Sequence, residues 1–111
     1  MAFDEHLADR VRLSLHEKNQ VCLEKKMMGG LVFMINEKMC LGIIKAELMA
    51  RIDPEIHAEA TLKKGCRTMD FTHQPMKGFV FVSPEGVDLD EDLDYWIQLA
   101  LDYNPKANKS K

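Results

Sequence analysis

Few side chains in this sequence have a type and spacing that could support catalysis. The nucleophile elbow of hydrolases, the phosphate-binding P-loop and the H-E-x-x-H zinc motif are all absent. Four histidines are scattered along the chain, and no two have the spacing of metal ligands on one helix. Asp70 and His73 form the nearby acid–base pair that is worth examining. We therefore expect no enzymatic activity, no cofactor and no small-molecule substrate, with this pair as the alternative.

The possible metal ligands do not form a site either. Cys22, Cys40 and Cys66 are odd in number and contain no C-x-x-C pair, so we expect free thiols in a reducing cytosol. The alternating acids of residues 88–94 resemble the start of a calcium loop, but Leu93 occupies the position that requires glycine. We expect these acids to cap the final helix instead.

Charge is unevenly distributed along the chain. The formal net charge is −3, yet residues 85–103 hold seven acids and no base. A general attraction to nucleic acid or to an acidic membrane is therefore not expected. The alternative function is a nucleic-acid-binding module with a basic patch beside an aromatic residue. The cations of that patch would be Lys25, Lys26, Arg51, Arg67 and Lys77.

One segment is similar to an RNA-recognition motif. In residues 77–82, Phe79 and Phe81 alternate as do strand aromatics that stack on bases, and residues 32–36 imitate the partner strand. Val80 replaces the required small residue, however, and further strands follow where that fold needs a helix. We expect instead a strand packed on both faces.

Hydrophobic periodicity predicts helices at both ends of the chain. Apolar residues recur every four positions over 3–18, and i, i+3, i+4, i+7 spacing runs through Leu93 to Ala100. Asp53-Pro54 predicts the start of a third helix, which would end near Lys63 to Gly65. Asp88 and Glu91 resemble a capping box for the last helix, and Asn104-Pro105 ends it.

Short apolar runs predict the strands, with a tight reversal at Asn36-Glu37 and a turn at Lys45-Ala46. The expected strands are 21–23, 31–35, 39–44, 48–52, 69–71 and 79–82. Short connections favour an α+β fold with two layers, in which three helices cover a mainly antiparallel sheet of about five strands. We expect one domain over residues 1–105 and a frayed lysine-rich tail over 106–111.

No segment suggests a membrane or a secreted location. The longest apolar run, 31–35, is far too short to cross a bilayer, and residues 1–5 are acidic rather than typical of a signal peptide. We expect a cytoplasmic protein.

Several segments together resemble the N-terminal domain of the TfoX/Sxy family, named for regulators of bacterial natural competence. The similarity includes residues 39–42, 48–51 and 53–55, and it is most specific over Met69 to Val82. The motif residues are Lys26, Met27, Gly29, Gly30, Met69, Asp70, Phe71, Pro75, Met76, Gly78 and Trp96. His73 departs from the glycine common at its position, and Met28 replaces the usual aromatic.

The resemblance implies an α+β fold and no catalytic residues. It also implies that the motif positions are structural, with the glycines required by backbone geometry and the large residues by the core. Competence regulators carry a second, C-terminal domain, whereas this chain stops soon after Pro105. We therefore expect a stand-alone, non-enzymatic interaction or regulatory module that acts through a protein partner, a second copy of the chain included.

Overall fold

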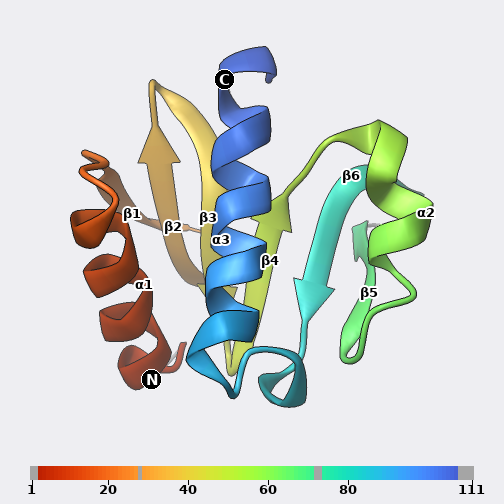
Figure 1. The fold of residues 1–111 in the computed structure, drawn as a ribbon, viewed down its shortest axis with the longest axis horizontal. Helices are drawn as coiled ribbons and strands as arrows, with labels where there is room; N and C mark the ends of the chain where they lie inside the picture. The colour runs from red at the N-terminus through yellow and green to blue at the C-terminus, as the bar shows by residue number, and fades with distance from the viewer. Residues whose placement is uncertain (1–2, 28, 72–73, 108–111) are drawn as a thin grey trace.

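The structure is a computed structural model that describes residues 3–27, 29–71 and 74–107, with side chains except at 69–71 and 74–77. One antiparallel sheet of six strands, in the order β1-β2-β3-β4-β6-β5, lies behind two long helices (Figure 1). The strands are β1 (Leu23–Met27), β2 (Gly30–Ile35), β3 (Lys38–Ile44), β4 (Glu47–Arg51), β5 (Cys66–Phe71) and β6 (Gln74–Val82). The two-layer α+β prediction is confirmed, with six strands rather than about five.

The helices occur in the predicted order. They are α1 (Glu5–Glu17), the short α2 (His57–Ala60) after a 3₁₀ turn at Pro54–Ile56, and α3 (Asp90–Tyr103). Further 3₁₀ turns occupy Pro84–Gly86 and Asn104–Lys106. Asp4 caps α1, since its Oδ1 accepts hydrogen bonds from the N–H groups of His6 and Leu7 at 2.9 and 3.2 Å. Asp53 caps the turn before α2 by accepting from the Glu55 N–H at 2.9 Å.

Five sequence expectations need correction. The last two strands begin earlier than expected, at Cys66 and Gln74 rather than at residues 69 and 79. The first strand begins at Leu23 rather than Val21, because Leu23 to Met27 pair with residues 30–34 of β2. The second helix ends at Ala60, and residues 61–65 form the turn that leads into β5. The final helix is capped at Leu89 without a side-chain hydrogen bond, so the expected capping box at Asp88 is not formed.

The β2–β3 hairpin contains a tight turn and a bulge. Asn36 and Glu37 adopt positive φ angles of 54° and 65°, which match the twist of a two-residue hairpin turn. The register shifts so that Phe33 pairs with Leu41 but Met34 pairs with Met39, which leaves Cys40 as the extra residue. As a consequence Cys40 and Leu41 both belong to the core between sheet and helices.

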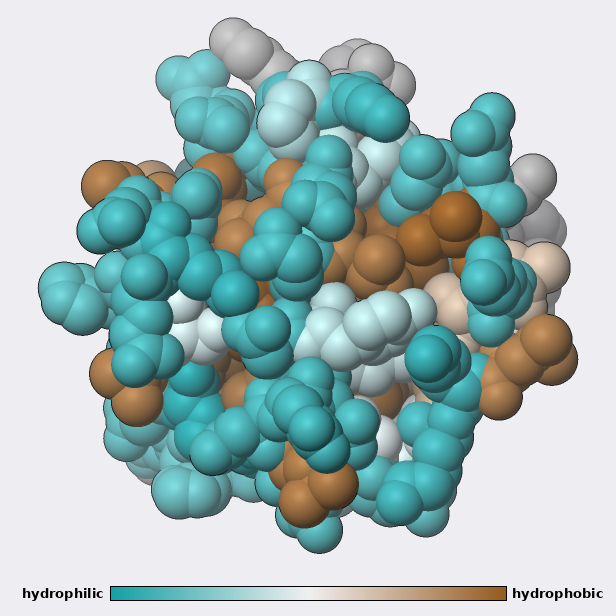
Figure 2. All heavy atoms as spheres, in the orientation of Figure 1, coloured by the Kyte–Doolittle hydropathy of each residue, from teal (hydrophilic) through white to brown (hydrophobic). Residues whose placement is uncertain are grey.

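That core lies on one face of the sheet only. It is formed by apolar residues of α1, α3 and the region around α2 packed on inward-facing strand residues, and Phe33, Leu41, Ile43 and Ile97 are fully buried within it. The outer surface of this helix-bearing layer is mostly hydrophilic, with apolar areas visible between the helices (Figure 2). None of the helices in the described ranges is long and apolar enough to cross a membrane.

Polar contacts hold the helices together and fix the end of α3. Arg10 of α1 and Lys18, which caps the end of α1, form ion pairs with Asp90 and Asp94 of α3 at 3.1 and 2.7 Å. The buried Asn104 side chain donates from Nδ2 to the carbonyl oxygen of Ile35 at 3.0 Å. It also accepts from Asn36 Nδ2 at 2.8 Å, so the chain after α3 is anchored to the β2–β3 turn.

Candidate functional site

The sheet has a second face, which we call the open face because the described helices pack on the other one. Antiparallel partners point to the same side of a sheet, so the register defines this face. One row of paired residues crosses all six strands on it. From β1 to β5 the row is Lys25, Val32, Gly42, Met49, Phe81 and Arg67.

The centre of the open face is apolar. Its residues form a cluster separate from the main core, in which Val32 and Met49 are buried and the other members are half-buried. The members are Val32, Met34, Met39, Met49, Phe79 and Phe81. Leu23 and Met27 of β1 extend the apolar surface toward one edge of the sheet, with 61% and 41% of their surface exposed. An antiparallel sheet that simply faced water would carry polar residues at these positions.

Two arginines cover the phenylalanine rings of this face. The guanidinium carbon of Arg51 lies 5.3 Å from the centre of the Phe79 ring, and that of Arg67 lies 4.8 Å from the centre of the Phe81 ring. Arg67 Nη2 also forms an ion pair with Glu47 Oε1 at 2.7 Å. These are cation–π contacts at the surface, and they add positive charge directly beside the apolar centre.

Gly42 leaves room at the centre of the face. A Cβ atom at this position would lie 2.5 Å from the terminal methyl carbon of Met49 on the neighbouring strand. The flexible Met49 side chain therefore lies across the backbone of β3, where a larger residue would displace it. Met49 thus fills the space above Gly42 and is itself buried.

The cations expected to bind nucleic acid are divided by the sheet. Lys25, Arg51 and Arg67 lie on the open face, whereas Lys26 pairs with Leu31 and so points to the helix-bearing side. The side chain of Lys77 lies outside the described residues. Phe79 and Phe81 share the open face, but Phe33 of the imitated partner strand is fully buried in the main core. The rings of Phe79 and Phe81 are already covered by arginine.

A histidine holds the motif glycine Gly78 in place. Gly78 has a φ of +90°, and a Cβ there would lie 3.1 Å from the carbonyl oxygen of Ile52, so glycine is required. Its N–H donates to Nδ1 of His57 at 2.9 Å, and His57 Nε2 lies 2.9 Å from Thr68 Oγ1. Because Nδ1 accepts, the Nε2–H tautomer donates to Thr68. His57 thus connects α2 to β5 and β6.

The remaining motif positions lie in turns, in strands and in α3, and the side chains of several are beyond the described residues. Gly29 has a positive φ of 75° in the turn between β1 and β2, and Trp96 is buried in the main core. The structure places the backbones of Met69, Asp70, Phe71, Pro75 and Met76 in β5 and β6. Their side chains, and His73 entirely, lie outside the described residues, so the Asp70–His73 pair stays an expectation.

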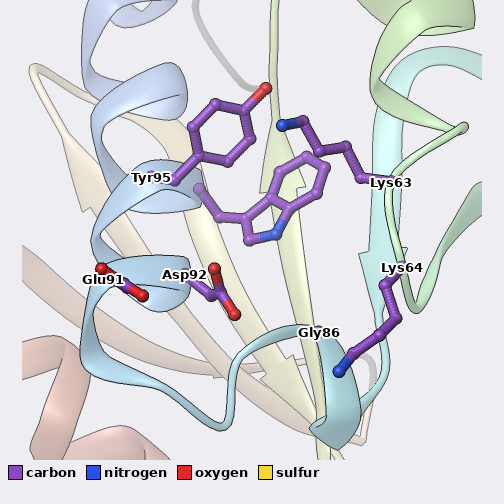
Figure 3. A pocket seen from close by; sticks show the side chains of 7 residues that line it. Lys63, Lys64, Gly86, Glu91, Asp92 and Tyr95 are labelled. Carbon is purple, nitrogen blue, oxygen red and sulfur yellow. The ribbon is translucent and has the colours of Figure 1, made fainter.

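A pocket of about 340 Å³ lies on the other side of the sheet, between the turn that precedes β5 and the first turns of α3. Lys63 and Lys64 line one wall, and Glu91, Asp92 and Tyr95 of α3 line the opposite wall (Figure 3). Trp96 and Gly86 also line the pocket. We did not predict this site from the sequence. In the sequence, the pocket corresponds to a pair of lysines and a later segment rich in acidic residues. The two segments are far apart in sequence, and only the fold makes them neighbours.

The other candidate chemistry is limited. Within the described ranges, no group of three or more histidine, cysteine or acidic side chains is placed to hold a metal ion. Burial raises the pKa of the Cys40 thiol to about 12 and that of the Cys66 thiol to about 11, and it also raises the pKa of Cys22. A thiol that resists ionisation is a poor nucleophile, so the three cysteines are chemically quiet at neutral pH.

Comparison with known protein families identifies the domain. The sequence model of the TfoX N-terminal domain matches residues 13–103, which is nearly the whole chain. The chain belongs to the TfoX N-terminal domain family. No curated protein and no solved structure matches it. The matched range of this TfoX N-terminal domain begins within α1 and ends with α3, so it includes every residue of the open face and of the pocket.

Proposed function

We propose that this TfoX N-terminal domain is a non-enzymatic, competence-regulator-like binding module. On the open face of its sheet it holds an amphipathic, acidic helix from a partner protein. The observation that carries the proposal is the apolar surface on the side of the sheet away from the described helices. Positions that would be polar in a solvent-facing sheet are occupied by methionine, valine and phenylalanine.

The dimensions of the open face favour a helix as the occupant. Six strands at about 4.8 Å spacing give a row about 24 Å long from Lys25 to Arg67. A helix of about 16 residues has that length and would complete a third layer over the sheet. The half-buried Met34 and Met39 and the exposed Met27 can adjust to the side chains of such a helix, as methionines do in other proteins that bind amphipathic helices.

Charge favours an acidic partner. Among the described side chains, the open face carries the cations Lys25, Arg51 and Arg67, and Glu47 on the same face is paired with Arg67. Carboxylates flanking the apolar stripe of a helix would meet the two arginines beside the phenylalanine rings. The same charge would suit a nucleic acid, but a base could stack on Phe79 or Phe81 only by displacing the arginine that covers it.

A titration with designed peptides tests the proposal. A labelled helical peptide of about 16 residues, with leucines at i, i+3, i+4 and i+7 and glutamates on both flanks, is added to the domain and followed by fluorescence anisotropy. A matched peptide carries lysines in place of the glutamates. We expect the acidic peptide to bind and the basic one not to bind.

The variants locate the binding. Arg51→Glu/Arg67→Glu should weaken binding of the acidic peptide at least about tenfold, since two attractive contacts become repulsive. Lys63→Glu/Lys64→Glu makes the same change in net charge on the other side of the sheet and should leave binding unchanged. Equal binding of both peptides, or of neither, would refute the proposal. So would tight binding of labelled single-stranded RNA that weakens steeply with salt and requires Arg51.

A cytoplasmic location accompanies this proposal. The three cysteines are free in the described structure, which suits a reducing compartment. Fractionation of cells that express the tagged full chain would test it, and recovery of the protein in a secreted or membrane fraction would contradict it.

A further inference from the structure

We propose that the pocket between the turn at residues 61–65 and the start of α3 binds a small zwitterionic molecule of dipeptide size. This site is independent of the open face, since the two lie on opposite sides of the sheet. The proposal combines a rigid floor, opposed charges that are not paired with each other, and the indole N–H of Trp96, which opens toward the pocket.

Close backbone packing makes the floor of the pocket rigid. The Ser83 N–H donates to the carbonyl oxygen of Gly65 at 2.9 Å, which joins the turn before β5 to the turn before α3. A Cβ on Gly86 would lie 2.5 Å from both the Lys64 carbonyl oxygen and Val82 Cγ1, so only glycine permits this approach. The two lysines are therefore held opposite α3 by backbone contacts.

The charged walls face each other without neutralising each other. Lys63 and Lys64 lie opposite Glu91 and Asp92 (Figure 3). Within the part of the chain that the structure describes, neither lysine forms an ion pair with either carboxylate. The Lys63 ammonium lies 4.5 Å from the centre of the Tyr95 ring, a cation–π contact that orients it at the rim. The gap thus lies between one positive and one negative wall.

Trp96 supplies the donor. Its side chain lines the pocket although the residue is only 2% exposed, and no described residue accepts a hydrogen bond from its indole N–H. No fully enclosed side-chain nitrogen or oxygen among the described residues lacks a partner, so this N–H keeps contact with open space. The open space beside Trp96 is the pocket, where a ligand acceptor would satisfy the donor.

Together these groups define the ligand class. A carboxylate fits the lysine wall, an ammonium fits the acidic wall, and a carbonyl between them fits the indole N–H. An extended dipeptide separates its two charges by about 7 Å, which is longer than the roughly 4 Å of a direct ion pair. A pocket of about 340 Å³ has the size of a small-molecule site.

The single tryptophan of the chain reports binding directly, because it lines the pocket. The probe is L-alanyl-L-alanine, compared with its N-acetyl form, which lacks the ammonium, and its C-terminal amide, which lacks the carboxylate. Each is titrated into the domain while tryptophan emission and the indole N–H signal in ¹H–¹⁵N spectra are recorded. We expect both signals to change saturably with the zwitterionic dipeptide. Each blocked form should bind at least about tenfold more weakly, because it loses one charge-assisted hydrogen bond.

Two variants then test the walls. Lys64→Ala and Asp92→Asn change partly or fully exposed side chains, so the circular dichroism spectrum should match that of the parent. Each variant should bind the zwitterionic dipeptide at least about tenfold more weakly than the parent does. Equal binding of the blocked forms would overturn the proposal, as would an indole signal that stays unchanged at saturating probe. The comparison of the zwitterion with its blocked forms uses the unaltered protein, so it tests the proposal even if a variant folds poorly.

Discussion

Replacing Asn104 with alanine should destabilise the domain strongly, because it removes a polar group that is fully satisfied inside the protein. The Asn104 side chain is buried and makes two hydrogen bonds, one to the buried Ile35 carbonyl oxygen and one from Asn36. Losing the first leaves an acceptor without its donor, which costs about 1–3 kcal/mol, and losing the second costs about 0.5–1.5 kcal/mol. The free energy of unfolding should therefore fall by about 2–4 kcal/mol.

That loss is large for a chain of this size. At about 4 °C per kcal/mol, the midpoint of thermal unfolding should fall by about 8–16 °C. The assay is urea denaturation monitored by circular dichroism. If the dependence of the free energy of unfolding on urea concentration is unchanged, the substitution has altered stability alone.

Asn36→Ala is the matched control, because it removes the hydrogen bond between the two side chains and leaves the one to Ile35. It should cost about 0.5–1.5 kcal/mol for that bond and about 1 kcal/mol more for alanine at a φ of 54°, and the double variant should cost less than the sum of the single ones because the residues share the bond. If Asn104→Ala lost less than about 0.5 kcal/mol, Asn104 would not be the anchor that holds the end of the chain.

Three further predictions concern other parts of the fold. Gly78→Ala should lower the free energy of unfolding by about 1–3 kcal/mol, because alanine is strained at a φ of +90°; thermal unfolding within about 0.5 kcal/mol of the parent would contradict this. The hydrogen bonds from Arg12 hold the pKa of Glu24 below its ordinary value. The free energy that they add to folding is therefore present at pH values above the pKa that Glu24 has in the unfolded chain. It is lost as the pH falls through the lower pKa that Glu24 has in the folded protein. Arg12→Ala should thus cost up to about 1 kcal/mol at pH 7 and less at pH 3 in urea titrations, and a pH-independent cost would refute the linkage. A thiol reagent should label Cys22 faster than Cys40, which is 1% exposed; equal rates would show that the core opens freely.

Local chemistry explains which parts of the fold were predictable. The apolar run 31–35, the Asn36-Glu37 turn and the Asp53 cap each depend on neighbours in sequence, and all three were predicted correctly. The first strand was misplaced because Leu23 to Met27 mixes exposed apolar and charged residues without clear alternation. Pairing with β2 defines it, and pairing is not a local property.

The candidate sites were harder to predict for the same reason. An apolar strand has the same sequence pattern whether its second face contacts a helix, a partner protein or other side chains of its own sheet. The run through Phe79 to Val82 was expected to pack on both faces, and the structure divides it. Val80 and Val82 enter the main core, while Phe79 and Phe81 meet Arg51 and Arg67. The pocket depends on a contact between Gly65 and Gly86 that no local pattern encodes.

The first strand of the sheet has a consequence for how the protein behaves at high concentration. β1 ends the strand order, so its outer backbone groups could template a strand from another molecule. An antiparallel copy centred on Lys25 would bring the two Lys25 ammonium groups together on the open face, whereas Glu24 points to the other face, where Arg12 engages it at 2.7 and 2.8 Å. In this register Lys25 therefore disfavours edge-to-edge polymerisation. The apolar open face beside it can remain exposed in the crowded cell without seeding aggregates through that edge.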